Sequence, residues 1–289
     1  MDQLERALID INTSDILAAL GWGNVRALRR WVGLAVRSPA AAFARRMRGF
    51  DRDVETLGVR RAARVMLRSY VRRLYVQGAG RIPARGPVLL LSNHPGMTDT
   101  LALFSAIPRA DLRILAADRP FLRALPAMSR SLIPVSDQKE RRMQAVRQAV
   151  AHLRGGGALL TFPAGEIEPD PAVLPGAVQA LARWSPSTVL FLRFIPDCTV
   201  VPLVVSGVLS PRAQRHPLTL LRKRKGDREL LGAMLQMAVH TLLPSLWPVE
   251  VSVNVLQPFA GAEMAGGEER ALVLLRERVE AFLSSRESA

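Results

Sequence analysis

The amino-acid sequence predicts an α/β fold, in which a largely parallel or mixed sheet is flanked by helices. From about residue 77 onward, short apolar runs alternate with helical patterns, which is typical of helices that cover a mostly parallel sheet. Before that point the patterns are helical only. The chain has 289 residues, 49% of them hydrophobic, which suffices for one large domain with a substantial core. We therefore expect an N-terminal amphipathic helical region over residues 1–76 and an α/β domain over residues 77–289.

The N-terminal region contains three helical patterns. Thr13 or Ser14 can cap a short helix through Leu20. Residues 24–37 form a basic amphipathic pattern, and residues 54–74 form a longer one. Arginines recur at every fourth position of the longer pattern: Arg60, Arg64, Arg68 and Arg72.

This arginine stripe has two interpretations, and both remain open at this point. It is typical of a solvated helix face. It is also typical of a helix that lies on anionic lipid, with Trp22, Trp31 and Phe43 available for the interface. On the second interpretation the N-terminal segment associates with a membrane.

The apolar runs predict six strands, each short and bounded by turn residues. The expected strands are Val88–Leu91, Arg113–Ala116, Leu132–Val135, Ala158–Phe162, Thr199–Val205 and Val249–Leu256. The helical patterns that follow them are Thr98–Ala106, Pro120–Met128, Lys139–Leu153, Gly176–Trp184, Arg228–Leu243 and Glu268–Leu283. In open α/β sheets, ligands gather beyond the carboxyl ends of strands, where we expect His94 and the loop after Phe162.

The formal net charge of +15 predicts an anionic partner, such as a membrane surface, an acidic carrier protein or a phosphorylated substrate. Nucleic acid is disfavoured, because the sequence has no recognised binding motif and only two tyrosines. The single cysteine, Cys198, excludes a disulfide within the chain and is expected in the core. No secretory signal is expected at the N-terminus.

The strongest candidate for a membrane span is the run without formal charge from Leu230 to Val249, whose length is nearly sufficient. Polar residues interrupt this run, and Pro244 would end a helix there. Because polar groups are costly in lipid, we expect a buried or interfacial helix and not a span.

The most informative segment joins the first apolar run to its helix. His94 and Asp99 lie five positions apart there, so the carboxylate can hold one ring nitrogen while the other faces a substrate. Gly96 shapes the turn, and Thr98 can cap the helix that follows. Alternatively, His94 is a turn residue and Asp99 only complements the helix dipole.

Two later blocks extend this pattern. The block Phe162-Pro163-Ala164-Gly165-Glu166 follows one expected strand, and Val200-Val201-Pro202-Leu203-Val204 lies in another. With His94-x4-Asp99, Phe-Pro-x-Gly and Val-Pro-Leu-Val in this order, residues 77–257 resemble the glycerolipid acyltransferase family. That family includes the glycerol-3-phosphate and 1-acylglycerol-3-phosphate acyltransferases.

The resemblance implies transfer of an acyl group from acyl-CoA or an acyl carrier protein to a hydroxyl of a lyso-lipid. It implies no acyl-enzyme, no cofactor and no metal. His94 would be the catalytic base, and Asp99 would fix its tautomer and stabilise the imidazolium. A backbone N–H near Gly165 would donate to the oxyanion. The substrate contacts that the matching motifs imply are Asn93, Phe162, Pro163, Gly165 and Glu166. The other histidines, His152, His216 and His240, are expected to be structural.

The chain departs from the family pattern where an acceptor phosphate would be held. Ala164 and Ile167 stand where the family usually has Glu and Arg, and Asp137 stands where a second Arg is usual. Because bidentate Arg is a favoured phosphate ligand, either a shifted cation replaces it or the acceptor is not a phosphate monoester. The cations that could replace it are Lys139, Arg141 and Arg142.

Three acidic residues, Asp137, Glu166 and Glu168, favour a neutral or amine-bearing lyso-lipid, unless they are solvated loop residues. We expect a peripheral protein on the cytoplasmic face of the cell membrane. The competing function is a non-catalytic lipid- or carrier-binding protein that retained the fold and lost acceptor binding.

Overall fold

The computed structural model describes residues 26–243, 246–260, 263 and 267–287, and the side chains of these residues between 40 and 286. The expected short helix through Leu20, Trp22 and the side chain of Trp31 lie outside the described part.

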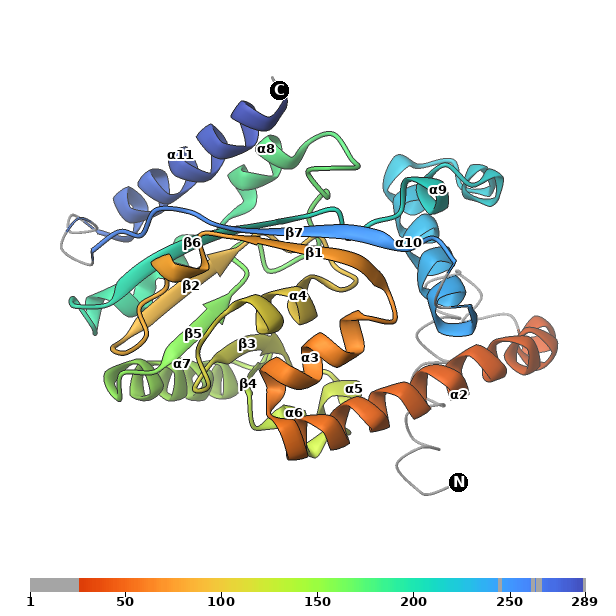
Figure 1. The fold of residues 1–289 in the computed structure, drawn as a ribbon, viewed down its shortest axis with the longest axis horizontal. Helices are drawn as coiled ribbons and strands as arrows, with labels where there is room; N and C mark the ends of the chain where they lie inside the picture. The colour runs from red at the N-terminus through yellow and green to blue at the C-terminus, as the bar shows by residue number, and fades with distance from the viewer. Residues whose placement is uncertain (1–25, 244–245, 261–262, 264–266, 288–289) are drawn as a thin grey trace.

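A seven-stranded mixed sheet organises the molecule (Figure 1). The strands are β1 (Val71–Gln77), β2 (Val88–Ser92), β3 (Arg113–Ala117), β4 (Leu132–Val135), β5 (Ala158–Thr161), β6 (Thr199–Ser206) and β7 (Val249–Val255). Their order across the sheet is β1-β7-β6-β2-β5-β3-β4. Neighbouring strands run parallel, except that β6 and β7 run antiparallel. The six expected strands are present, and the predicted α/β fold is confirmed.

Helices pack on both faces of the sheet. The α-helices are α2 (Arg26–Leu57), α3 (Val59–Leu67), α4 (Asp99–Ala106), α5 (Pro120–Arg123), α6 (Pro126–Ser129), α7 (Lys139–Arg154), α8 (Ala177–Ala180), α9 (Pro211–Gln214), α10 (Lys225–Leu242) and α11 (Glu268–Glu287). The 3-10 helices are η1 (Ala79–Arg81), η2 (Leu181–Arg183), η3 (Pro186–Arg193) and η4 (Pro217–Leu221). Figure 1 shows α11 along one side of the molecule and α2 along the opposite side.

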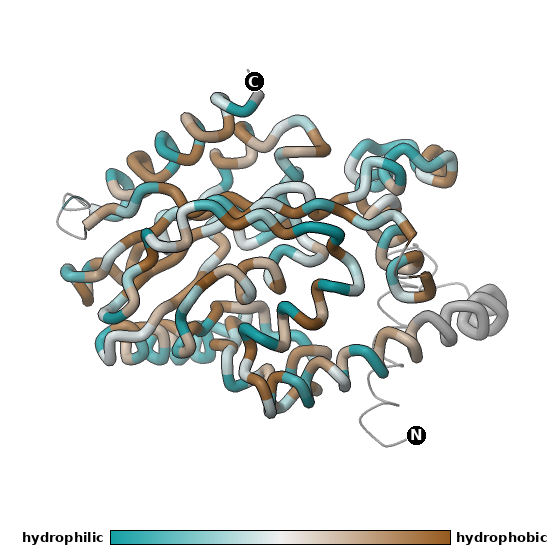
Figure 2. The backbone as a smooth tube through the Cα atoms, in the orientation of Figure 1, coloured by the Kyte–Doolittle hydropathy of each residue, from teal (hydrophilic) through white to brown (hydrophobic). Residues whose placement is uncertain are grey.

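Strand β2 shows how the two cores are divided. Val88 and Leu90 pack into the core that includes α2, α3 and α4, whereas Leu89 and Leu91 pack into the core that includes α7 and α11. All four side chains are fully buried, because alternate residues of a strand point to opposite faces. Figure 2 shows this concentration of hydrophobic residues on the central strands.

The structure corrects the expectation for residues 54–74, which do not form one helix. α2 ends at Leu57, and Gly58 adopts a φ of 78°, a left-handed conformation that glycine tolerates. α3 then ends at Leu67 and the chain enters β1, so Arg72 lies on a strand and not on a helical stripe.

Two elements of the expected lipid-facing surface have partners within the protein. Arg60 Nε and Arg64 Nη2 both donate to the carbonyl of Ser105 at 3.3 Å. Phe43 stacks on Phe121, with ring centroids 5.7 Å apart. These side chains therefore join the helical region to the α/β region.

The expectation that residues 1–76 are only helical is wrong for β1, which begins at Val71. β1 is an edge strand, and Val71 is its one buried residue. Because edge strands are exposed and tolerate charge, its sequence VRRLYVQ lacks the apolar run that marks the central strands. The sheet thus begins six residues before residue 77.

The run from Leu230 to Val249 enters both α10 and β7. The expected helix is present, and the side-chain amide of the buried Gln236 accepts from the amide of Ser210 and donates to the carbonyl of Val208. Among the described residues, no helix combines the length and the hydropathy that crossing a membrane requires.

Candidate active site

A tight turn after β2 brings Asp99 back to His94. Gly96 and Met97 both adopt positive φ, 84° and 55°. A positive φ costs about 1 kcal/mol at a residue other than glycine, so the turn is held against local strain. Glycine suits position 96 because of this φ, and a Cβ there would also lie 3.0 Å from Cδ1 of the exposed Ile167, which would have to shift.

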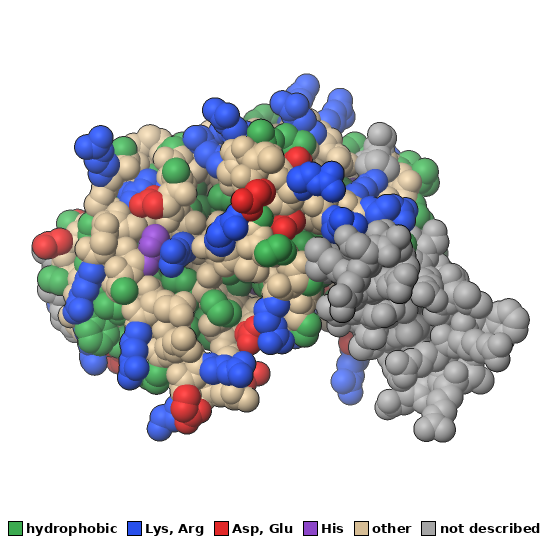
Figure 3. Space-filling view, turned by 90° about the horizontal axis from the view of Figure 1, so that it is seen from below, with side chains coloured by type: hydrophobic (Ala, Val, Ile, Leu, Met, Phe, Trp, Pro, Cys, Tyr) green, Lys and Arg blue, Asp and Glu red, His purple; other side chains and the backbone are tan. Residues whose placement is uncertain are grey.

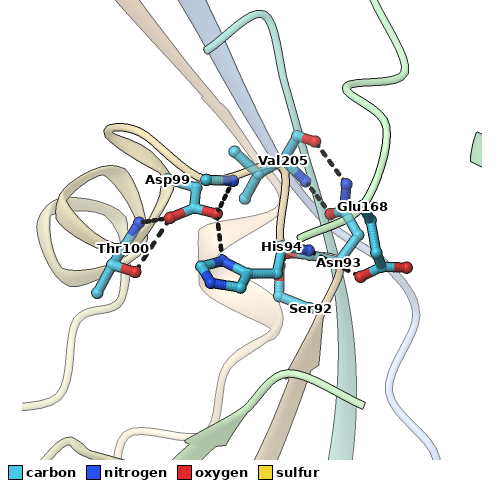
Figure 4. A network of polar contacts seen from close by, with 8 residues as sticks. Ser92, Asn93, His94, Asp99, Thr100, Glu168 and Val205 are labelled. Carbon is cyan, nitrogen blue, oxygen red and sulfur yellow. Dashed lines mark hydrogen bonds and ion pairs between the residues drawn. The ribbon is translucent and has the colours of Figure 1, made fainter. Parts of the chain in front are cut away.

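The two side chains meet as the sequence predicts. His94 Nδ1 lies 2.7 Å from Asp99 Oδ2, and the same oxygen accepts from the amide of Gly96 at 2.8 Å. Asp99 Oδ1 accepts from the amide and the hydroxyl of Thr100. Asp99 is 1% exposed and the His94 side chain is 25% exposed. Figure 4 shows the second ring nitrogen pointing away from Asp99.

The surroundings of His94 act on its pKa in opposite directions. Burial lowers the pKa, while the hydrogen bond and the charge of Asp99, with a smaller contribution from Glu168, raise it. The net effect is a pKa above the usual histidine value. A histidine whose Nδ1–H is held by a carboxylate presents Nε2 as the proton acceptor, so this geometry suits a general base.

Asn93 connects β2 to β6. Its amide nitrogen donates to the carbonyl of Val205 at 2.9 Å, and its amide oxygen accepts from the Val205 N–H at 2.7 Å. Because Asn93 is buried and the contacts use both ends of its amide, the structure places it as a link between strands.

Glu168 holds the backbone of His94. Its Oε2 accepts from the N–H of His94, and the N–H of Glu168 donates to the carbonyl of His94, each at 2.8 Å. Its Oε1 accepts from Nε1 of the buried Trp184, also at 2.8 Å. Burial raises the pKa of Glu168 against the opposing effect of these donors. Neither sequence interpretation of Glu168, a solvated residue or a selector of the acceptor, fits this buried clamp.

The Phe-Pro-x-Gly block lies beside the histidine. The ring of Phe162 stacks on the ring of His94, with centroids 4.2 Å apart. The amide of Gly165 donates to the carbonyl of Phe162 at 3.0 Å, so this N–H is engaged in a turn. Pro163 is buried, and Glu166 is exposed and pairs with Arg183 at 2.9 Å. The neighbouring amides of the turn therefore remain the candidate oxyanion donors.

Thr98 departs from its expected role. It occupies the N-cap position of α4, but its side chain makes no capping hydrogen bond, and its buried hydroxyl has no partner among the described residues. At the start of α4, the amide of Thr100 instead donates to Asp99 Oδ1.

The three candidate phosphate ligands, Lys139, Arg141 and Arg142, are exposed at the start of α7, after β4. Arg141 lies 3.8 Å from Asp118, and Arg142 donates to the carbonyl of Asp137 at 2.7 Å. β4 is three strands from β2, roughly 14 Å at the usual strand spacing. The residues share the sheet edge with His94 without touching it. Figure 3 shows Lys and Arg side chains spread over the face it displays.

The remaining histidines and the cysteine have structural surroundings. His152 Nε2 lies 3.0 Å from the carbonyl of Ala158, His240 Nε2 lies 3.0 Å from that of Trp247, and His216 accepts from the amide of Leu218. Cys198 is buried, and burial raises the pKa of its thiol to about 12, which does not suit a nucleophile.

Comparisons with known proteins bear on this site. Residues 73–206 match the family model described as Acyltransferase. Among solved structures, the chain is similar to the crystal structure of the 1-acyl-sn-glycerophosphate (LPA) acyltransferase, PlsC, from Thermotoga maritima. Identity is 16% and the TM-score is 0.49, over 99% of this chain and 95% of that chain. The comparison with curated proteins gives no match.

The match covers the stretch that holds His94, Asp99 and the Phe-Pro-x-Gly block, so the chain carries an acyltransferase domain. The match of residues 73–206 to the Acyltransferase model supports the resemblance that the motifs indicate.

Proposed function

We propose that the protein transfers a fatty acyl group from an acyl-CoA or acyl carrier protein thioester to a hydroxyl of a lyso-lipid, with His94 as general base. The observation that supports this most directly is the 2.7 Å contact between His94 Nδ1 and Asp99, at the carboxyl end of β2, with Nε2 directed away from the carboxylate. An alcohol needs such a base, whereas a thioester is already an activated acyl donor.

In the proposed reaction, Nε2 of His94 takes the proton of the acceptor hydroxyl as its oxygen bonds to the thioester carbonyl carbon. The carbon–sulfur bond then breaks, and the imidazolium returns the proton to the departing thiolate. The products are an ester and a free thiol. Asp99 stabilises the imidazolium between these steps, and backbone amides near Gly165 would stabilise the oxyanion.

Glu168 would act as a positioning residue for the base. Glu168→Gln replaces one accepting oxygen with an NH2 group that faces the N–H of either His94 or Trp184. We expect kcat to fall about 10-fold, because small displacements of a catalytic group are costly. The pKa of His94 should also fall, because the charge of Glu168 raises it. Since the base must be neutral, the acidic limb of the kcat/KM profile should move to lower pH.

Trp184→Phe is the matched control, because it removes the other partner of Glu168 and keeps the charge. It should leave the acidic limb in place. An acidic limb that stays in place in Glu168→Gln would contradict the electrostatic part of this role.

For the acceptor, we propose a neutral or amine-bearing lyso-lipid. Asp137 is exposed after β4 and Glu166 is exposed after β5, and neither position offers a guanidinium for a phosphate monoester. With labelled acyl-CoA and a panel of lyso-lipids, we expect lysophosphatidate to be used about 10-fold less efficiently than the best acceptor, since an unpaired phosphate beside a carboxylate is repelled. A preference for lysophosphatidate would refute this choice and favour Lys139 or Arg141 as phosphate ligands.

We also propose that the protein works as a peripheral protein on the cytoplasmic face of the membrane. The lyso-lipid acceptor resides there, and the net charge of +15 favours an anionic surface.

A further inference from the structure

The segment between β6 and α10 exposes leucines that the core does not use. In η4, Leu218, Leu220 and Leu221 are 48%, 68% and 75% exposed. Thr219 is buried among them, and its hydroxyl donates to the carbonyl of His216 at 2.7 Å. The polar residue points inward and the apolar ones outward, the reverse of the usual partition. Adjacent exposed apolar residues of this kind mark an interaction surface.

Basic residues flank these leucines in the sequence. We call residues 211–230 the η4 tip, and it contains seven basic residues against two acidic ones. The exposed cations are Arg212, Arg215, Lys223, Arg224, Lys225 and Arg228. One ion pair, Lys225 with Glu229 at 3.8 Å, offsets part of this charge. Exposed apolar side chains with neighbouring cations are typical of surfaces that insert into anionic bilayers.

The apolar and basic character continues beyond η4. Leu230 and Met237 lie two turns apart on one face of α10, and both are exposed. A hollow of about 230 Å³ lies between the η4 tip and the loop after β5, and its charged lining residues are Arg215, Lys225, Arg228 and Glu229. Three cations against one carboxylate leave the hollow net positive, which suits the phosphate of a lipid headgroup.

The η4 tip stands at the same edge of the sheet as the histidine. β6 runs parallel to β2, so the chain leaves β6 at the edge where His94 lies. α10 in turn contacts α2, because Arg46 Nη1 donates to the carbonyl of His240 at 2.6 Å. Figure 1 accordingly shows α9, α10 and one end of α2 on one side of the molecule.

We propose that the η4 tip docks the protein on an anionic membrane surface, with its three leucines entering the bilayer and its cations binding lipid phosphates. The inference rests on the proposed function, because a lyso-lipid acceptor stays in the bilayer. Docking through this tip would turn the edge of the sheet that carries His94 toward that substrate.

Co-sedimentation with vesicles of about three parts phosphatidylcholine to one part phosphatidylglycerol tests the proposal on the full chain. Leu220→Ser/Leu221→Ser should lower the partition coefficient by at least about 10-fold, because both leucines lose their burial in lipid. Lys223→Gln/Arg224→Gln should lower it by about 25-fold, at roughly fivefold per cation, and by less at high salt. The matched control on α11, Arg270→Gln/Val273→Ser, also alters exposed residues and should bind as the wild type does.

Turnover of a lyso-lipid dispersed in detergent separates this inference from the proposed function. Lost vesicle binding with unchanged turnover supports the docking surface. If the wild type shows no turnover, the proposed function fails, and vesicle binding still decides the docking. The proposal would be overturned if the leucine variant and the cation variant both bound vesicles as strongly as the wild type does. The proposal would also be overturned if the variants bound vesicles normally but no longer bound an acidic acyl carrier protein. That result would identify the tip as a surface for the carrier protein.

Discussion

His94→Ala is expected to lower kcat/KM for acyl transfer by about 10³- to 10⁴-fold, the loss that follows removal of a positioned general base. Without the imidazole, the acceptor hydroxyl must lose its proton to water. The side chain is 25% exposed and lies at the end of a strand, so its removal leaves the core intact. Product formation from labelled acyl-CoA and the best lyso-lipid of the panel measures the effect, and thermal unfolding confirms that the variant is folded.

His152→Gln is the matched control for this prediction. It removes a histidine on α7 whose ring nitrogen meets the carbonyl of Ala158, and Gln can also donate there. Turnover should stay within about twofold of the wild type. If the His94→Ala variant retained a tenth of the wild-type activity, His94 would not be the general base. A wild type that turns over no acceptor would favour the non-catalytic lipid- or carrier-binding alternative.

The sequence predicted the strands whose burial is visible in their own short run of apolar residues. Leu89 and Leu91 face one core and Val88 and Leu90 the other, so the run is apolar throughout and its burial is visible in the sequence. β1 was not predicted because it is an edge strand that pairs with β7, about 180 residues away, and exposes its arginines.

In the candidate site, too, contacts between residues close in the sequence were predictable and contacts between distant segments were not. The spacing of His94 and Asp99 predicted their contact, because five residues with a glycine suffice for the turn. Glu168 holds His94, and Asp170 accepts from the amides of Gly207 and Leu209, so both acids bind segments that are distant in the sequence and that no local pattern reveals. The one signal available is the sequence Glu168-Pro169-Asp170-Pro171, in which two acids alternate with prolines that cannot donate hydrogen bonds themselves.

Asp170→Asn is expected to lower the free energy of unfolding by about 3 kcal/mol and the midpoint of thermal unfolding by about 6 °C. Asp170 is 0% exposed. Its Oδ1 accepts from the amides of Ala172 and Gly207 at 3.0 and 2.8 Å, and its Oδ2 accepts from the amide of Leu209 at 2.9 Å. In asparagine, one of these oxygens becomes a donor that faces another donor with no water to separate them.

Asp227→Asn is the matched control, since Asp227 is exposed and the same chemical change should stay within about 0.5 kcal/mol of the wild type. Denaturant unfolding of both variants measures the difference. A loss below 1 kcal/mol for Asp170→Asn would show that the loop after β6 can rearrange around the new donor. A full loss should be accompanied by reduced turnover, because Asp170 fixes the loop after β5, and that loop carries both Phe162 on the His94 ring and Glu168 on its backbone.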